Sequence, residues 1–452
     1  MVRSEDGQLH VVGSPVEKFG SGASLPAKLP PRTRGPKVST QTWHTADCPW
    51  FSTLVFQFAF ERIEPTVSNT PLAPTSLTSP TAGQVIRAYA CQCGHPIFFR
   101  NSTCLACNTP LGYHPEQALL LSLMPGTTHD TWVDWKTEGP EYHRCANLNT
   151  PAACNWLLPV SESLAHKQLC RACRLNRTIP DLADPQHPEN GELWGRIELA
   201  KRRLVSALLV MGLPVASRET EDTARGLMFD FLRSPDCGPR VMTGHNDGLI
   251  TLDIMEADHG KRETTREAMQ ESYRTLVGHL RHEVGHYYWD RVVAGTEWLS
   301  GFRALFGDET QDYGDRLRAY YKNGPPADWA LHFVSAYASS HPWEDWAECW
   351  AHYMHMRDTV DTAQSFGLSI DSTQLEFTPF QMDDLHQPEH PQADRFLALL
   401  NRWTQLTMLL NGMSRAMGQP DFYPFVLAHE VVPKLQFIDL LVNATREQAS
   451  AS

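Results

Sequence analysis

The sequence contains no apolar run long enough to cross a membrane. A spanning helix needs about 20 consecutive apolar residues, and the longest apolar stretch, around Trp50 to Phe60, is much shorter. The first twenty residues also lack the apolar core of a signal peptide. We therefore expect no membrane partner and a cytoplasmic address, with the nucleus as the alternative.

Positive charge is scarce, with 39 Lys and Arg against 52 Asp and Glu and a net charge of −13. A general nucleic-acid binder needs a basic face toward the phosphates, so we expect no nucleic-acid partner. Arg171, Arg174 and Arg177 form a local basic cluster, but residues 86–182 hold eight Lys and Arg against seven Asp and Glu. We also find no glycine-rich phosphate loop and no convincing Ser/His or Cys/His nucleophile pattern.

Three regions differ in composition, and 452 residues suffice for two to three domains. Residues 1–85 are rich in Pro, Ser and Thr around a short apolar segment at 46–64, which predicts a disordered tail and linker. Residues 86–182 hold eight of the 11 cysteines and predict a small β domain. Residues 190–445 predict a mostly helical domain with a small sheet, closed by two amphipathic helices whose methionines at 408, 413 and 417 we expect in the core.

The first cysteine set predicts a structural zinc site. Cys91-x-Cys93 is followed, after ten residues, by Cys104-x₂-Cys107. In a reducing compartment cysteines at such spacing are metal ligands rather than disulfides. Four thiolates would close a tetrahedron around zinc and stabilise a fold too small to be held by burial alone.

A second cysteine set predicts a further structural zinc. Cys145 and Cys154 are followed by Cys170-x₂-Cys173. The first half of this set is looser than a usual zinc knuckle, so we expect one to two structural zinc ions in all. The apolar stretch CNWLLPV would pack between the two sites.

The stretch from His282 to His286 has the pattern H-E-x-x-H. Residues four apart lie on one face of a helix, so His282 and His286 can offer two imidazoles to one ion. Glu283 lies beside that face, where it can reach a metal-bound water. Two nitrogens and one carboxylate would leave a coordination position open, which is typical of catalytic rather than structural zinc.

The neighbouring sequence supports a helix and a sheet at this site. REAMQESYRTL predicts a helical lead-in, and the helix would continue through buried Tyr287, Tyr288 and Trp289. Residues 248–258 predict a strand that follows a turn at His245-Asn246-Asp247-Gly248. This strand could form the exposed sheet edge along which an extended peptide binds.

The third zinc ligand is predicted downstream, in SAYASSHPWEDWAECWAHYMHM. Pro342 can open a helix, which places Glu344 and Glu348 on one face. We interpret Glu344 as the third ligand and Glu348 as the acceptor that orients a ligand histidine, with the reverse assignment as the alternative. A solvated acidic face is disfavoured because tryptophans surround the two carboxylates.

Other polar residues near the motif are candidates for supporting roles. Tyr337 lies seven residues before Glu344 and could donate a hydrogen bond to the oxyanion of a tetrahedral intermediate; core packing is the equal alternative. His332 and His341 are further oxyanion candidates. For His279, three residues before the motif, we favour an orienting or packing role.

These motifs together resemble the zinc-binding metallopeptidases that carry an N-terminal zinc-ribbon domain. The resemblance covers residues 86–442 and rests on CQCGHPIFFRNSTCLACNTPLGY, CNWLLP, LCRACRLNRTIPDL, AKRRL, GHLRHEVGHYYWD and SAYASSHPWEDWAECWAHYMH. It implies a double zinc ribbon followed by a gluzincin-like peptidase domain. Within that clan, the pattern H-E-x-x-H with a downstream E-x-x-x-E looks like His282, Glu283, His286, Glu344 and Glu348. Tyr337 resembles the transition-state tyrosine of some members.

We therefore predict an α+β protein with a double zinc ribbon and a zincin-like domain. The expected activity is zinc-dependent hydrolysis of a peptide or protein substrate, with Glu283 as general base on zinc-bound water and one catalytic zinc. One alternative is a non-catalytic, zinc-stabilised scaffold that binds other proteins, although a scaffold has no need for Glu283. A nucleic-acid-associated protein is the less favoured alternative because of the acidic net charge.

Overall fold

The computed structural model describes residues 2–3, 9–10, 86–137, 139–268, 274–369 and 375–451. Two short strands, β1 (Val2–Arg3) and β2 (Leu9–His10), form an antiparallel pair. The rest of the predicted tail, including the apolar segment at 46–64, lies outside the described residues. All later elements belong to one compact unit, and its mixture of helices and sheets confirms the predicted α+β class. Across the described ranges, no helix is long and apolar enough to cross a membrane.

The cysteine-rich region is built from a hairpin and a five-stranded sheet. Strand β3 (Tyr89–Ala90) pairs antiparallel with β4 (Pro96–Ile97). The sheet has the order β5-β6-β7-β8-β9, with strands Leu111–His114, Leu119–Pro125, Trp132–Asp134, Tyr142–Arg144 and Leu157–Pro159. Tyr113 and Trp156 are fully buried, with ring centroids 5.0 Å apart. An aromatic core therefore supplements the predicted metal sites.

A second sheet has the order β10-β11-β13-β12. Its strands are β10 (Asn176–Thr178), β11 (Met228–Leu232), β13 (Leu249–Asp253) and β12 (Gly244–Asn246). The first three run parallel and β12 runs antiparallel to β13. Strand β10 comes from the end of the cysteine-rich region, so this sheet joins that region to the helical part of the chain.

The sheet edge differs from the prediction. We expected the strand within 248–258 to be exposed at the edge, but this is wrong because β12 pairs along its outer side. His245 and Asn246, predicted as part of a turn, belong to this edge strand. The turn is confined to Asp247 and Gly248, which both have positive φ angles, 48° and 81°. This backbone conformation favours a two-residue hairpin loop. The observed turn is therefore two residues long instead of the predicted four, and His245 and Asn246 pair with β13.

Three helices form the centre of the unit: α2 (Asn190–Val210), α4 (Leu276–Tyr288) and α8 (Pro342–Ser365). We predicted that the stretch REAMQESYRTL would lead into α4 as one helix. Its last residues do not, because the Thr275 hydroxyl accepts a hydrogen bond from Gly278 N at 3.0 Å and caps a new helix. Tyr287, Tyr288 and Trp289 are buried as predicted. Pro342 opens α8, also as predicted.

Helices α4 and α8 pack at very close range. A Cβ on Gly285 would lie 3.1 Å from Ala347 Cα and 3.2 Å from Trp350 Cβ, so only glycine fits without displacing its neighbours. The Trp346 indole donates a hydrogen bond to the Gly285 carbonyl at 2.9 Å. This contact fixes the faces of α4 and α8 that carry the histidines and the glutamates.

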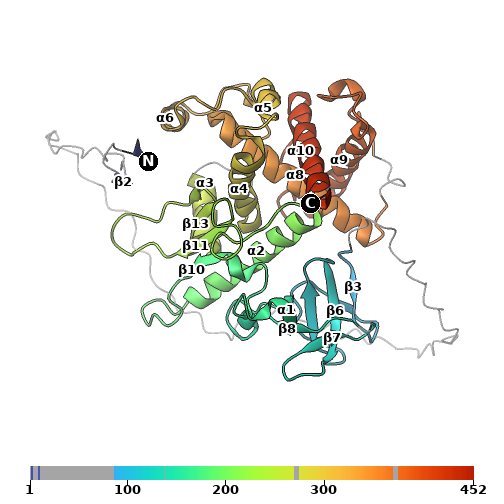
Figure 1. The fold of residues 1–452 in the computed structure, drawn as a ribbon. Coiled ribbons are helices and arrows are strands. Elements are labelled where there is room, and N and C mark those ends of the chain that lie inside the picture. The colour runs from blue at the N-terminus through green and yellow to red at the C-terminus, as the bar shows by residue number, and fades with distance from the viewer. Residues whose placement is uncertain are drawn as a thin grey trace, which may run out of the picture. The chain divides into compact units, whose positions relative to one another are not determined.

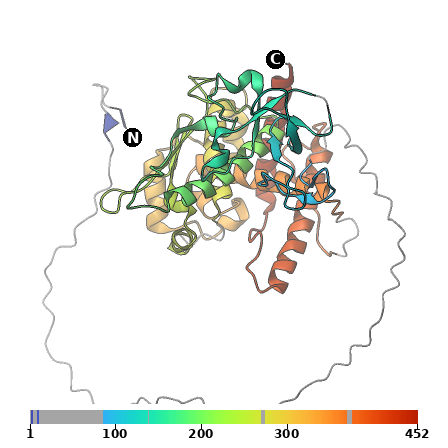
Figure 2. The same ribbon diagram turned by 90° about the horizontal axis from the view of Figure 1, so that it is seen from below.

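Further helices surround this pair: α3 (His259–Ala268), α5 (Leu299–Phe306), α6 (Tyr313–Asn323), α7 (Trp329–His332), α9 (Ala393–Ala416) and α10 (Val432–Ala451). In Figure 1 and Figure 2 the late helices α9 and α10, in orange to red, lie together on one side of α2. Both were predicted as covering helices. Their methionines are not core filler, however, because Met408, Met413 and Met417 are 39%, 58% and 79% exposed.

Candidate metal centre

Helices α4 and α8 bring three potential ligands together. One ligand atom each from His282, His286 and Glu344 lies within 4.8 Å of the others. The Nε2 atoms of His282 and His286 are 3.3 Å apart, and His282 Nε2 lies 3.0 Å from Glu344 Oε2. A tetrahedral set with bonds of about 2.0 Å spaces its ligand atoms by about 3.3 Å. The residues therefore fit a zinc ion.

Glu348 contacts the other side of the His282 ring. Its Oε1 lies 2.7 Å from His282 Nδ1, and its Oε2 accepts a hydrogen bond from the Ser335 hydroxyl at 2.5 Å. A carboxylate on Nδ1 favours the proton on that nitrogen and leaves Nε2 free to bind a metal. The structure thus places Glu344 at the Nε2 side of the His282 imidazole and Glu348 at its Nδ1 side.

Glu344 is an almost fully buried carboxylate, 1% exposed. Burial raises its pKa, but the imidazoles of His286 and His282 outweigh burial and hold the pKa well below the ordinary value. Its Oε1 accepts a hydrogen bond from Tyr313 at 2.6 Å. Within the described residues, Oε2 is buried without a hydrogen-bond partner. A buried carboxylate oxygen without a hydrogen-bond partner, 3.0 Å from the His282 Nε2 atom, is the kind of atom that a cation would satisfy.

Glu283 lies on α4 beside the ligand histidines and is 6% exposed. Burial raises its pKa, but a hydrogen bond from His279 and the nearby histidines lower it below the ordinary value. His279 Nε2 lies 3.2 Å from Glu283 Oε1, and His279 Nδ1 lies 3.7 Å from Glu256 Oε2. Burial lowers the pKa of His279, but its two carboxylate neighbours raise it to about 9. His279 is therefore charged at neutral pH and holds Glu283 in place.

The predicted oxyanion candidates occupy different environments. Tyr337 lies beside His282, with ring centroids 6.0 Å apart, and its hydroxyl forms no hydrogen bond within the described part of the chain. His341 caps α8: its Nδ1 accepts from Trp343 N at 3.1 Å and its Nε2 lies 3.2 Å from the Gln311 carbonyl. His332 pairs with Glu430 on the surface. Of the three, Tyr337 alone adjoins the metal ligands with an uncommitted hydroxyl.

The edge strand β12 brings another histidine to the centre. His245 stacks on His286 with ring centroids 6.4 Å apart, and its Nε2 accepts a hydrogen bond from Gly248 N at 2.8 Å. Burial lowers the pKa of His245 to about 4, with a further contribution from His286. This neutral ring fixes the distance between the sheet edge and the metal helix.

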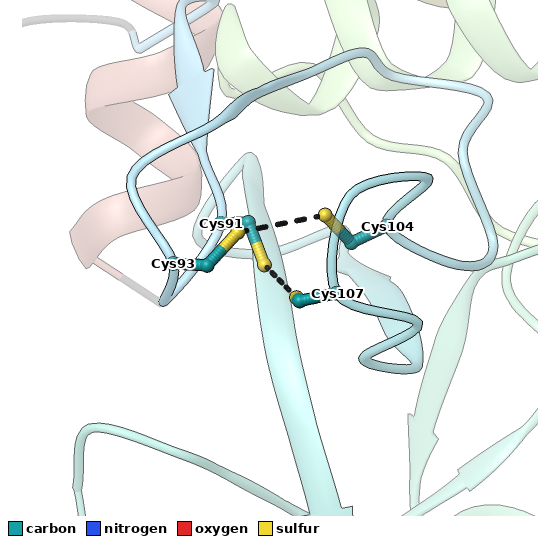
Figure 3. Close-up of side chains that lie close together, drawn as sticks. All are labelled: Cys91, Cys93, Cys104 and Cys107. Atoms are coloured by element: carbon teal, nitrogen blue, oxygen red, sulfur yellow. Dashed lines mark hydrogen bonds between the residues drawn. The ribbon is translucent and has the colours of Figure 1, made fainter.

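The first cysteine set forms a four-sulfur cluster. Figure 3 shows the four side chains pointing toward one another, from the β3–β4 hairpin and from the loop before β5. The Cys91–Cys107 and Cys93–Cys104 sulfur pairs are 3.6 Å and 3.8 Å apart. Sulfurs held at about 2.3 Å from one tetrahedral zinc are spaced by about 3.8 Å. The cluster therefore fits zinc.

The second cysteine set forms another such cluster. One sulfur each from Cys145, Cys154, Cys170 and Cys173 lies within 4.8 Å of the others, and the Cys154 and Cys170 sulfurs are 3.6 Å apart. Cys145 Sγ accepts a hydrogen bond from Cys170 N at 3.5 Å. All four residues are buried, so the loose spacing along the sequence does not prevent a compact cluster.

Comparison with known proteins identifies the family. The chain matches the family described as "Putative zinc-binding metallo-peptidase" over residues 190–441, and a zinc-ribbon domain family over residues 88–184. The chain belongs to this zinc-binding metallopeptidase family. It is 39% identical over 360 residues to uncharacterised proteins of Mycobacterium bovis and Mycobacterium tuberculosis, across 79% of this chain and 96% of each relative. No solved structure matches the chain.

The sequence did not point to three residues around the candidate metal centre. Tyr313 contacts Glu344 from 31 residues upstream, a separation without a local pattern. His245 was assigned to a turn, and Ser335 lies in a stretch without periodicity. His245 could have been suspected, because it is a polar residue close to a strand that we predicted at a sheet edge. No comparable sequence feature marks Tyr313 or Ser335.

Proposed function

We propose that this metallopeptidase family member is an active zinc-dependent peptide hydrolase. His282, His286 and Glu344 would hold the catalytic zinc, and Glu283 would act as general base. One observation carries the proposal: one ligand atom each from His282, His286 and Glu344 lies within 4.8 Å of the others, and a further buried carboxylate, Glu283, follows His282 on α4. Family membership supports zinc-dependent hydrolysis in general.

Zinc, when bound, would polarise the carbonyl of the scissile peptide bond and make water easier to deprotonate. Glu283 accepts a proton from the attacking water at a carboxylate oxygen. As the water oxygen bonds to the carbonyl carbon and the C–N bond breaks, Glu283 delivers that proton to the leaving nitrogen. The hydrogen bond from His279 orients the carboxylate for both transfers.

The substrate would bind along β12. This strand pairs with β13 on one side, and its other side is a sheet edge. An extended peptide can add to such an edge by main-chain hydrogen bonds. Because every peptide has the same main chain, this mode of binding accepts many substrate sequences. The stacking of His245 on His286 supports a scissile bond held next to the ligand histidines.

Tyr337 would stabilise the oxygen that gains charge as water adds to the carbonyl. Its ring adjoins His282, and its hydroxyl is uncommitted among the described residues. A phenol that donates to a developing oxyanion can contribute a factor of about 10² to 10³ in turnover. His341 is unsuited to this role because both of its nitrogens already have partners.

The test combines zinc content and turnover. We expect about three zinc ions per wild-type chain and about two in a His282→Ala/His286→Ala variant, measured by elemental analysis. A Glu283→Gln variant should keep all three ions and lose at least about 100-fold in turnover on a peptide library. Unchanged turnover in this variant would contradict the mechanism. About two zincs in both the wild type and the double variant, even with added zinc, would favour the scaffold alternative.

A further inference from the structure

Tyr313 is a second phenol at the metal centre, and it has a different partner from Tyr337. It is the first residue of α6, and its hydroxyl donates a hydrogen bond to Glu344 Oε1 at 2.6 Å. Tyr337 has no such bond within the described residues. Of the two phenols, only Tyr313 therefore donates a hydrogen bond to a predicted metal ligand.

This bond makes the two oxygens of Glu344 different. Oε1 is occupied by Tyr313, and it lies 3.6 Å from His286 Nε2. Oε2 lies closer to an imidazole, 3.0 Å from His282 Nε2, and is buried with no hydrogen-bond partner in the described ranges. A carboxylate can bind a metal through one oxygen or both, and a strong donor on one oxygen favours the other as the ligand.

The ring of Tyr313 is held by the beginning of α8. It packs edge-to-face on His341, with centroids 5.2 Å apart, and lies 6.1 Å from Trp343. His341 caps α8 two residues before Trp343. Directly before Tyr313, the Asp312 carboxylate caps the N-terminus of α6 by accepting a hydrogen bond from Asp315 N at 2.7 Å. The phenol is therefore pre-oriented by both helices and does not depend on the ion for its position.

We infer that Tyr313 is a positioning residue that restricts Glu344 to one-oxygen coordination of the metal. This inference rests on the proposed function, because it assumes that Glu344 is a ligand. Its consequence is chemical: one carboxylate oxygen and two nitrogens leave space for water and a substrate carbonyl, whereas a two-oxygen carboxylate would occupy part of that space.

The test compares two variants that each lose one phenol hydroxyl, Tyr313→Phe and Tyr337→Phe. Zinc affinity at the third site is measured by competition with a chromophoric chelator, while the two thiolate sites stay loaded. Co²⁺ is then added to the emptied third site and its visible spectrum recorded. We expect Tyr313→Phe to weaken zinc binding by about 10- to 100-fold and to alter the Co²⁺ spectrum, and Tyr337→Phe to match wild type in both.

Three results would decide against the inference. Wild-type affinity and spectrum in Tyr313→Phe would overturn it while leaving the proposed function intact. A phenolate-to-metal band in the Cu²⁺-loaded wild type that disappears in Tyr313→Phe would make the phenol a direct ligand instead. A third site that binds no ion in any protein would overturn the proposed function as well. Two retained thiolate zincs in each variant serve as the check on folding.

Discussion

The two four-cysteine clusters have the same ligands but very different surroundings. In the first, Cys93 and Cys107 are exposed, and the cluster links a two-stranded hairpin to one loop. In the second, all four cysteines are 0–2% exposed. The first cluster therefore lies at the boundary of the main core, which includes its other two cysteines, Cys91 and Cys104, whereas the second cluster lies entirely within that core.

The second cluster lies against α2, which also packs on the metal helix α4. Glu198 on α2 approaches Cys173, with Oε2 3.9 Å from the sulfur, and Lys201 pairs with Glu198 at 2.7 Å. Arg202 donates a hydrogen bond at 2.9 Å to the carbonyl of Ala152, a residue that lies between Cys145 and Cys154 in the chain. Four thiolates around Zn²⁺ are formally dianionic, so buried cations beside them offset a large desolvation cost. One ligand set thus joins a hairpin to a loop in the first site, and in the second it packs the cysteine-rich region against α2.

The largest effect should come from removing one sulfur of the buried cluster. A Cys170→Ser variant would leave thiolates buried without zinc, beside Glu198, in a core shared with α2. We expect it to lose its cooperative unfolding transition, measured by circular dichroism. Cys107→Ser at the exposed cluster should lose one zinc and keep that transition. Equal melting temperatures for the two variants would abolish the distinction between the sites.

The next effect concerns the cation that accompanies the buried cluster. Lys201 and Glu198 are both fully buried. Lys201→Met would remove the ion-pair partner of Glu198 and leave it the Asn176 amide as a donor, and it should cost about 3–5 kcal/mol in the free energy of unfolding, measured with urea. Arg203→Met changes the exposed neighbour on the same helix and should cost less than about 0.5 kcal/mol. A similar loss in both variants would mean that α2 does not compensate the cluster.

Metal removal should separate the two clusters by rate. The exposed sulfurs of Cys93 and Cys107 give a chelator direct access, whereas the second cluster is released only when the core opens. Once the third site has been emptied, a larger excess of chelator under native conditions should remove one further zinc per chain early, from the first cluster. Mild urea should accelerate the release of the buried zinc only. Simultaneous release of both ions would contradict this order.

The smallest effect is the pH dependence of thiol reactivity in zinc-free protein. A hydrogen bond with Thr109, at 3.0 Å, lowers the pKa of Cys107 to about 6. Only the thiolate reacts with iodoacetamide, so the alkylation rate of Cys107 should rise with pH with its midpoint near pH 6. Mass spectrometry of peptides would follow this. Thr109→Val should move the rise to higher pH, and Cys170 should stay unmodified until the protein unfolds.

The local patterns were sufficient for much of the fold. Helical periodicity predicted α2, Pro342 predicted the start of α8, and composition predicted the α+β class, because each depends on neighbours within one or two turns. The cysteine pairs and the H-E-x-x-H pattern also predicted which residues would be found near one another. Four-residue spacing on a helix determines the separation of His282 and His286 almost independently of the rest of the chain.

Contacts between distant segments were decided by the tertiary structure. Whether β13 was an edge depended on the three residues of β12, which resemble a turn in isolation. The contact of Tyr313 with Glu344 depends on how α6 meets the beginning of α8. Complete burial of the second cysteine cluster, in contrast to the half-exposed first cluster, depends on where α2 packs. Spacing along the chain thus predicted the candidate ligands and their neighbours on one helix face. Packing between segments decided which Glu344 oxygen and which phenol meet and how deeply each cysteine cluster is buried, because those contacts have no period along the chain.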